Sequence, residues 1–354
     1  MDKIRLGLIG LGAMGKGHFN IYVQLMNEGF PVELVALCDI DRKKFEDAEN
    51  SDTNLAEFKD SKIDFSAYKC YTDYKEMIEK EELDMVSVVI PTYEHYEATV
   101  YALKHGLHVL CEKPMALSER QCQLMIDAAK ESGKRLMIGQ CLRFWGEYAV
   151  AKEVIDSGKY GKVLAASFFR GGQPPATEWF FDRHKGGGAL FDQHVHDIDM
   201  VNYLFGLPKA VSSIGCVGVP GSGYDIVSTN YFYDGMSVTT QDDWMDFVPD
   251  FKMEFRINLE RATIKYNNLK GFGVYTNQSD VDGGELFTVP TKSVNATPEF
   301  KSGEGYYNEI KYFMNTILNN TENTINPPES SMNTIRIALA ETKSCDLKGE
   351  IVTL

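Results

Sequence analysis

The sequence lacks the features by which membrane-bound and exported proteins are recognised. Its 354 residues contain no apolar run long enough to span a bilayer. The apolar stretch after Met1 is too short for the core of a signal peptide, and no small-residue cleavage site follows it. The seven cysteines are scattered and form no C-x-x-C pair, which is typical of reduced, mostly buried thiols. We therefore expect a cytoplasmic protein with no membrane partner.

Positive charge is also scarce. The chain has 36 lysines and arginines against 51 acidic residues, a formal net charge of -15. Nucleic acid and anionic membrane surfaces repel such a chain, so we expect neither as a partner. A hydrophobic share of 44% and a charged share of 25% are typical of a globular protein, and 354 residues exceed one ordinary core. The composition therefore predicts two domains.

The first part of the chain, up to about residue 140, alternates short β-branched apolar runs with longer helical stretches. Such alternation favours a parallel sheet covered by helices on both faces. The expected strands are Ile4–Ile9, Val32–Cys38, Met85–Ile90, His108–Cys111 and Arg135–Gly139. The expected helices are Tyr74–Lys80, Tyr96–His105 and Glu119–Ser132.

From about Lys162 onward, strands follow one another without intervening helices, which favours a mostly antiparallel sheet. The segment 252–260 alternates with period two and places Met253, Phe255, Ile257 and Leu259 on one face. The other expected strands are Val163–Phe169, Ala210–Val219, Ile226–Tyr233 and Ser237–Trp244, and a packing helix is expected after Pro327-Pro328.

These two patterns predict an α/β protein. We expect a doubly wound Rossmann domain over residues 1–125 and, over residues 126–354, an α/β domain with a large open, mostly antiparallel sheet. The later helices are too few to cover both faces of that sheet. Because large uncovered faces usually mark interfaces, we expect a homo-oligomer.

A glycine-rich turn, Gly10-Leu11-Gly12-Ala13-Met14-Gly15, lies between the first strand and the first helix. The first glycine makes the tight turn, the second lets backbone amides approach a pyrophosphate, and the third lets the helix pack closely on the strand. The helix N-terminus adds free amides and the positive end of a dipole. We predict that Gly10, Gly12, Ala13, Met14 and Gly15 bind a dinucleotide.

Asp39 ends the second apolar run, where a carboxylate can accept hydrogen bonds from both hydroxyls of the adenosine ribose. A 2′-phosphate beside this carboxylate would be repelled by a few kcal/mol, at about 4 Å and an effective dielectric near 20. Arg42 would soften the repulsion, but Asp41 stands beside it. We therefore expect NAD rather than NADP. The alternative is an ordinary glycine turn with Asp39 as a helix N-cap.

Two further segments have the residue types of catalysis. Lys113 follows a strand of the Rossmann half, so it should lie at the carboxyl edge where ligands bind. The flexible turn 186–188 leads into Asp192 and His196, which are spaced i, i+4 and share a face if they lie on one helix. A carboxylate there can hold the imidazole in one tautomer, and histidine titrates near neutral pH, as a base for a hydroxyl proton should.

We expect no metal. His194 and His196 would point about 200° apart on a helix, and no third ligand is evident nearby. His18, which follows the glycine turn, is expected to be structural.

With these motifs, the sequence resembles the Gfo/Idh/MocA family, named after glucose–fructose oxidoreductase, inositol dehydrogenase and a rhizopine-catabolism protein. The resemblance spans essentially the whole chain. The matching segments are Gly10–Gly15, Pro91–His95, Glu112–Pro114, Arg143-Phe144, Ser157–Val163, Gly187-Gly188 with Asp192 and His196, and Tyr306–Glu309. One departure is Trp145-Gly146-Glu147, where many members have a proline before the acid.

The resemblance implies that Lys113, Asp192 and His196 form the catalytic group beside the nicotinamide. It also implies dimers or tetramers. By the same carry-over, the cofactor is lined by Thr92, His95, Glu112 and Lys113, and the substrate by Lys113, Arg143, Trp179, Asp192 and His196. A tryptophan such as Trp179 is a candidate platform for a sugar ring, with a core position as the alternative.

The implied activity is hydride transfer between NAD and a secondary alcohol of a sugar, glycoside or inositol, so the partner is a small carbohydrate or polyol. Two alternatives stay open. One is a glycosidase that uses bound NAD in a transient oxidation. The other is a non-catalytic regulator that senses the cofactor, against which the presence of Lys113, Asp192 and His196 argues.

Overall fold

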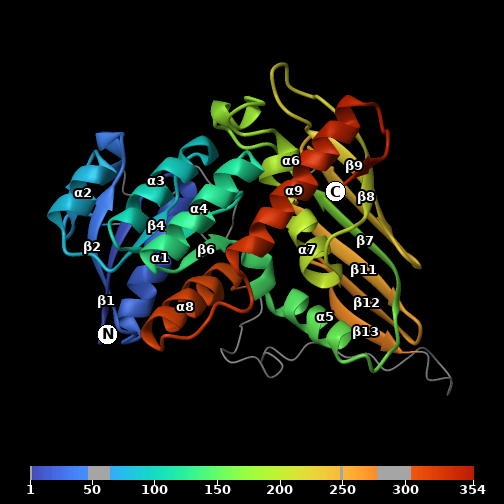
Figure 1. The fold of residues 1–354 in the computed structure, drawn as a ribbon, viewed down its shortest axis with the longest axis horizontal. Helices are drawn as coiled ribbons and strands as arrows, with labels where there is room; N and C mark the ends of the chain where they lie inside the picture. Colours follow the sequence, from blue (N-terminus) through green and yellow to red (C-terminus); the bar gives the residue numbers. More distant parts are fainter. Residues whose placement is uncertain (1, 47–63, 248–249, 277–303) are drawn as a thin grey trace. The chain divides into compact units, whose positions relative to one another are not determined.

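The computed structural model describes residues 2–46, 64–247, 250–276 and 304–354, which form two compact units (Figure 1). The first unit comprises Met1–Gly139 with Glu309–Met332, and the second Gln140–Asn308 with Asn333–Leu354. The domain boundary expected after residue 125 stays a prediction. No local pattern predicts that residues 309–332 join the first unit, because periodicity identifies a helix but not the sheet it covers.

The first unit contains a six-stranded sheet in which every pair of neighbouring strands is parallel. Its interior strands are almost wholly buried, as expected for a sheet with helices on both faces. In spatial order, the strands are β3 (Lys69–Tyr71), β2 (Val32–Cys38), β1 (Ile4–Ile9), β4 (Met85–Val88), β5 (His108–Glu112) and β6 (Leu136–Gly139). This strand order is that of a Rossmann fold and confirms the predicted fold class.

Helices connect these strands. Helix α1 (Ala13–Asn27) joins β1 to β2, and the predicted helices α2 (Tyr74–Lys80) and α4 (Glu119–Ser132) have the expected bounds. Helix α3 (Thr92–Lys104) begins four residues before its predicted start, and the short η1 (Arg42–Phe45) follows β2. The ends of α4 are encoded locally: the Ser118 hydroxyl accepts from the backbone N–H of Gln121 at 3.3 Å, and Gly133 ends the helix with φ +64°.

The second unit contains an eight-stranded sheet. Only β7 and β10 pair in parallel, and the other neighbours are antiparallel, which confirms the mostly antiparallel prediction. In spatial order, the strands are β13 (Gly271–Thr276), β12 (Ala262–Asn267), β11 (Lys252–Leu259), β7 (Val163–Gly171), β10 (Met236–Asp243), β9 (Ile226–Tyr233), β8 (Ala210–Cys216) and β14 (Val352–Thr353).

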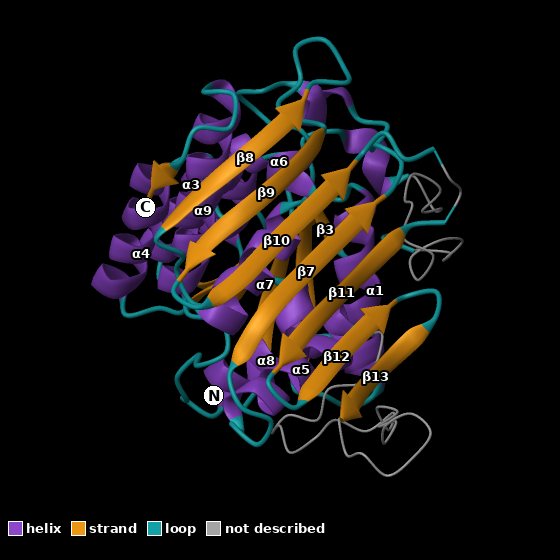
Figure 2. Ribbon diagram, turned by 90° about the vertical axis from the view of Figure 1, so that its right-hand side faces the viewer, coloured by secondary structure: helices purple, strands orange, loops and turns teal. Residues whose placement is uncertain are grey.

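Helices cover one face of this sheet, and within the described ranges no helix lies over the other, here called the open face (Figure 2). In β11, the side chains of Met253, Phe255, Ile257 and Leu259 are all buried, as the period of two predicts. Figure 2 looks onto the opposite face, where the strands lie in front of the helices. The helices of this unit are α5 (Gly146–Asp156), α6 (Ala189–Asp192) and α7 (Val195–Phe205). Most of α8 (Gly305–Leu318) belongs to the first unit, and α9 (Pro328–Asp346) begins in the first unit and continues in the second.

Two short 3₁₀ turns precede α5 and α6: η3 (Cys141–Phe144) and η4 (Glu178–Phe181). No sequence pattern predicts either turn. Helix α9 begins at Pro328, as the double proline predicts. Among the described residues, no helix is both long and apolar enough to cross a membrane.

Substitutions on the two faces of β11 should have very different effects on the free energy of unfolding. Ile257 is fully buried, so Ile257→Ala should lower the free energy of unfolding by about 2–5 kcal/mol. Arg256 lies on the exposed face, and Arg256→Ala should change that free energy by less than about 0.5 kcal/mol. Urea denaturation of both variants measures the difference. Equal losses would show that the burial of this strand is wrongly described.

Candidate functional site

The candidate residues of the first unit gather at one edge of its sheet. Because β1, β2, β4 and β5 are parallel, their carboxyl ends share that edge. Gly10 follows β1, Asp39 follows β2, Thr92 begins α3 after β4, and Lys113 follows β5. In parallel α/β sheets this is the edge where ligands bind.

The glycines of the first turn are required by close contacts. Gly10 has φ +99°, and a Cβ there would lie 2.0 Å from the carbonyl oxygen of Val89. A Cβ on Gly15 would lie 2.0 Å from the carbonyl oxygen of Gly10. A Cβ on Gly12, by contrast, would extend into open space, with no atom within 4 Å. The predicted roles of Gly10 and Gly15 therefore agree with the geometry, and Gly12 leaves room at the start of α1.

Asp39 is half-buried and binds the backbone of this turn. Its Oδ2 accepts from the Leu11 N–H at 2.7 Å, and its Oδ1 accepts from the Asp41 N–H at 2.9 Å. Two carboxylate oxygens offer about four acceptor sites, so these bonds leave capacity for ribose hydroxyls. Asp39 also ties the end of β2 to the glycine turn, a contact that the sequence alone does not reveal.

The residues of this edge fit a dinucleotide. Helix α1 begins at Ala13 with Met14 in its first turn, has no acidic residue in that turn, and has a glycine without a side chain as its N-cap. The positive end of its dipole suits a pyrophosphate, and the open space beside Gly12 suits close approach of the phosphate oxygens. Asp39 has acceptor capacity that fits ribose hydroxyls. Direct contacts of these residues with a cofactor stay predictions.

Glu112, the last residue of β5, is buried together with His18 of α1. His18 Nε2 lies 2.9 Å from Glu112 Oε1, and Glu112 Oε2 accepts from the backbone N–H of Lys113 at 3.1 Å. Burial alone would raise the pKa of the Glu112 carboxyl, but the hydrogen bond and charge of His18 outweigh it and lower that pKa. Glu112 is therefore held as a carboxylate that binds the backbone of the half-buried Lys113.

His95 is buried in α3 and connects two loops of the same edge. Its Nδ1 lies 2.8 Å from the carbonyl oxygen of Pro114, and its Nε2 lies 2.8 Å from that of Ile90. Burial is the largest cause that lowers the pKa of His95, although both carbonyls act in the opposite sense. A neutral imidazole has one N–H and donates to one of these two carbonyls at a time. A direct contact of His95 with the cofactor remains a prediction. Thr92 is buried at the start of the same helix.

In the second unit, the glycine turn before α6 is tightly packed, so its description as flexible is wrong. Gly187 and Gly188 have φ +80° and +72° and are buried. A Cβ on Gly223 would lie 2.0 Å from the carbonyl oxygen of Gly187. The N–H groups of Gly186 and Gly187 both donate to the Asp182 carbonyl oxygen, at 2.9 and 3.1 Å. These glycines are needed for positive φ and close approach.

The single helix assumed for Asp192 and His196 is interrupted. Helix α6 ends at Asp192 and α7 begins at Val195. Between them, the His194 N–H donates to the carbonyl oxygen of Ala189, five residues earlier, at 2.8 Å. This wide turn changes the register, so the i, i+4 argument does not hold as stated. His196 is 9% exposed and Asp192 is half-buried. Their catalytic pairing stays a prediction.

Arg143 is 1% exposed and forms a bidentate pair with Asp199 of α7. Its Nε and a terminal nitrogen donate to the two carboxylate oxygens at 2.8 and 2.7 Å. The guanidinium carbon lies 4.7 Å from the ring centre of Tyr203, and Thr334 also donates to Asp199, at 2.8 Å. These contacts give Arg143 a structural role, and a contact with substrate stays a prediction.

Trp179 lies in η4 and is half-buried. Its ring stacks on that of Phe180, with centroids 3.8 Å apart and an interplanar angle of 24°. Phe180 in turn meets the buried Trp244 edge-on at 6.2 Å. One face of Trp179 is thus covered by an aromatic cluster, and its use as a sugar platform remains a prediction.

A buried polar network surrounds His194. Its Nε2 lies 3.0 Å from Glu341 Oε2, and Asp197 accepts from Arg170 at 2.9 Å. Burial alone would lower the pKa of His194, but the charge of Glu341 outweighs it and raises that pKa. Burial also raises the pKa of Asp242 to about 8.

Within the described residues, His194, Asp197 and Asp242 are the group whose ligand atoms, all within 4.8 Å of one another, come nearest to a metal site. Its members already have partners within the protein, however. Arg170 pairs with Asp197 at 2.9 Å, His194 pairs with Glu341 at 3.0 Å, and the Gln193 amide donates to Asp242 at 3.2 Å. We therefore interpret this network as structural.

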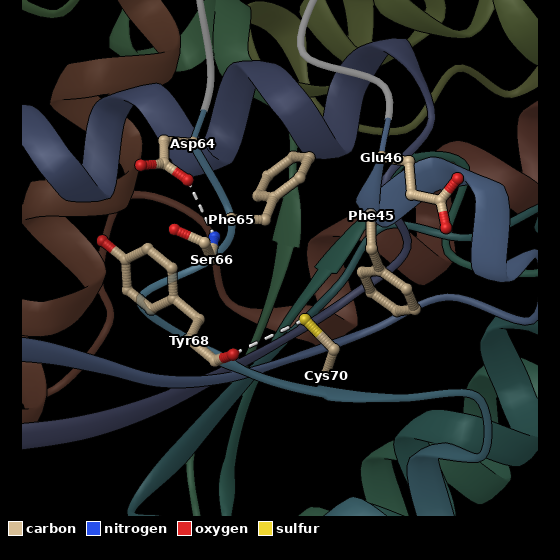
Figure 3. Close-up of a pocket in the computed structure, with 7 residues that line it drawn as sticks. All are labelled: Phe45, Glu46, Asp64, Phe65, Ser66, Tyr68 and Cys70. Carbon is tan, nitrogen blue, oxygen red and sulfur yellow. Dashed lines mark hydrogen bonds between the residues drawn. The ribbon is translucent and has the colours of Figure 1, made fainter.

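A pocket in the first unit is lined by residues from η1 to β3 (Figure 3). Asp64 accepts from the Ser66 N–H at 2.9 Å in its wall. None of the predicted site residues lines it. Its lining residues are Phe45, Glu46, Asp64, Phe65, Ser66, Tyr68 and Cys70.

Models of one protein family match most of the chain. Residues 4–140 match the model GFO_IDH_MocA, described as an oxidoreductase family with an NAD-binding Rossmann fold. Residues 148–265 match the model of the GFO/IDH/MocA C-terminal domain. The two models thus cover the glycine turn and Lys113 in the first unit, and Asp192 and His196 in the second.

Curated relatives are similar over part of their length. A 2,7-anhydro-N-acetylneuraminate hydratase of Mediterraneibacter gnavus is 32% identical over 212 residues, 58% of this chain and 52% of that protein. An inositol 2-dehydrogenase of Salmonella typhimurium is 29% identical over 202 residues, 57% of this chain and 54% of that protein. The matched regions therefore span about half the length of these relatives.

A levoglucosan dehydrogenase, solved in complex with NADH and levoglucosan, has the same fold along the whole chain. The likeness covers 99% of both chains with a TM-score of 0.82 at 21% sequence identity. At this identity the likeness shows the fold alone.

The position of Asp39 predicts the choice of cofactor. Asp39→Ser removes the charged acceptor, so NAD affinity should fall by roughly 10- to 100-fold and the preference for NAD over NADP should narrow. Asp41→Asn, a change at the neighbouring acid, is the control and should leave both affinities close to wild type. Titration of each variant with NAD and NADP measures this. Wild-type protein that binds NADP more tightly than NAD would contradict the assignment.

Proposed function

Because this chain belongs to the Gfo/Idh/MocA oxidoreductase family, we propose that it transfers hydride between NAD and a secondary alcohol of a sugar, glycoside or inositol. The observation that supports this most is the shared carboxyl edge of the first unit. There, a glycine turn with open space at Gly12, the acceptor Asp39 and the half-buried Lys113 follow three parallel strands. The inositol 2-dehydrogenase among the relatives supports a polyol or carbohydrate substrate.

Lys113, Asp192 and His196 are the catalytic group of this proposal. NAD, when bound, supplies the hydride acceptor. His196 takes the proton from the substrate hydroxyl, which lets the carbon release hydride, and Asp192 orients and charge-balances the imidazole. Lys113 hydrogen-bonds the reacting oxygen and shares the proton transfer.

The remaining residues bind rather than react. Gly10, Gly12, Ala13, Met14 and Gly15 hold the pyrophosphate, and Asp39 selects the unphosphorylated ribose of NAD. Thr92, His95 and Glu112 line the cofactor, and Arg143 and Trp179 lie near the substrate.

A second candidate is a reaction without net oxidation, such as glycoside cleavage through transient oxidation by bound NAD. The specific observation that favours it is the relative named as a hydratase rather than a dehydrogenase. A screen of sugars, inositols and glycosides with excess NAD separates the two. A dehydrogenase accumulates NADH in proportion to substrate, whereas the second candidate converts a glycoside while NADH stays at or below the enzyme concentration.

Removal of the proposed base should abolish most turnover. General acid–base groups contribute about 10²–10⁴-fold, so His196→Ala and Lys113→Ala should each reduce kcat by that factor. NAD affinity should largely survive the His196 change. In the wild type, activity should rise with pH as the histidine loses its proton, and the His196 variant should lack that limb. A His196→Ala protein that binds NAD and retains near-normal kcat would show that the histidine is structural.

We also propose that the chain is a cytoplasmic homodimer or homotetramer. All seven cysteines are free, which supports a reducing compartment. Ile214 and Phe232 alternate with buried residues in β8 and β9 and are 65% and 39% exposed, which supports an interface on the open face of the large sheet. Light scattering at micromolar concentration should give a multiple of 39.8 kDa. A mass of 39.8 kDa at this concentration would show a monomer and refute the proposed oligomer.

A further inference from the structure

His18 makes two contacts from α1 to parallel strands of the first unit. Its Nδ1 lies 3.1 Å from Ser87 Oγ in β4, and its Nε2 lies 2.9 Å from Glu112 Oε1 in β5. All three residues are at most 5% exposed. The helix that starts at the dinucleotide turn is therefore joined to the segment that bears Lys113.

We propose that His18 is a positioning residue that fixes the backbone of Lys113 through Glu112. The inference rests on the proposed function, in which Lys113 bonds the reacting oxygen. It differs from the expectation that His18 is merely structural, because it assigns one of the two ring contacts to catalysis.

The hydrogen bond between His18 and Glu112 has a fixed direction. An ionised carboxylate accepts and cannot donate, so Nε2 of His18 carries the proton that is directed to Glu112. With the first oxygen engaged by His18, the second is aimed at the Lys113 N–H. The orientation of one side chain in α1 thus determines where this amide is held.

The surroundings leave Glu112 little freedom to adjust. A Cβ on Gly139 would lie 3.0 Å from the Glu112 carboxyl carbon, so β6 closes directly on the carboxylate. On the other side of Lys113, His95 holds the carbonyl oxygen of Pro114 at 2.8 Å. Lys113 is therefore held between two histidine contacts, and loss of the His18 contact would release one end. A shift of about 1 Å in a reacting group can cost about 10²-fold in rate.

Two amide substitutions separate the contacts of His18. Glutamine places its amide nitrogen near the position of imidazole Nε2, and asparagine near that of Nδ1. His18→Gln should therefore retain the bond to Glu112, and His18→Asn should retain only the side facing Ser87. We expect kcat close to wild type for His18→Gln and a loss of up to about 100-fold for His18→Asn. NAD affinity should stay near wild type in both, because the dinucleotide turn is unchanged.

Equal kcat values in the two folded variants would overturn the proposal, as would losses that follow melting temperature alone. Should His18→Asn fail to fold, Glu112→Gln decides, since glutamine has one acceptor oxygen in place of two and cannot accept from both His18 and the Lys113 N–H at their present positions. A fall in kcat with unchanged NAD affinity supports the proposal, and an unchanged kcat refutes it. If Lys113→Ala abolishes turnover while His18→Asn leaves kcat unchanged, this inference is refuted and the proposed function stays intact.

Discussion

Glu112 ends a parallel strand with its carboxylate removed from water, and a buried charge of this kind is stable only when donors surround it. The donors come from two places: the His18 ring in α1 and the backbone N–H of Lys113. Because α1 also begins at the glycine turn, one buried carboxylate joins this helix to the backbone of Lys113, the proposed catalytic lysine. The close packing at Gly10 and Gly15 brings α1 near enough to the sheet for this contact.

The second unit follows the same rule with other pairs. Arg143 with Asp199 and Arg170 with Asp197 are bidentate and almost fully buried. Both aspartates lie on α7, which also holds His196, so one ion pair joins that helix to β7 of the sheet and the other joins it to η3. Breaking either pair would leave an uncompensated buried charge, a change that costs about 3–5 kcal/mol in typical proteins.

Sequence periodicity predicted the elements that depend on local pattern. The strand before Asp39 and the alternation in β11 came directly from runs of apolar residues, because burial on one or both faces requires that pattern. The i, i+4 spacing of Asp192 and His196 failed as a helix argument, because a wide turn at His194 satisfies tertiary contacts with Glu341 that spacing does not encode.

The contacts of the candidate site were the hardest to predict. His18 and Glu112 are 94 residues apart, and His194 and Glu341 are 147 residues apart. The residues next to both histidines are partly polar, so no local pattern shows that either histidine has a buried partner. The identity of that partner depends on sheet order, which no local pattern gives.

In the proposed reaction, the substrate hydride ends on the nicotinamide. The direct measurement uses an accepted alcohol that carries deuterium on the carbon to be oxidised, with NAD in excess and mass analysis of the cofactor. Hydride transfer from this carbon should give one singly deuterated molecule of reduced cofactor for each molecule of ketone formed. Reduced cofactor that carries only hydrogen from water, or product that forms while no reduced cofactor accumulates, would contradict it.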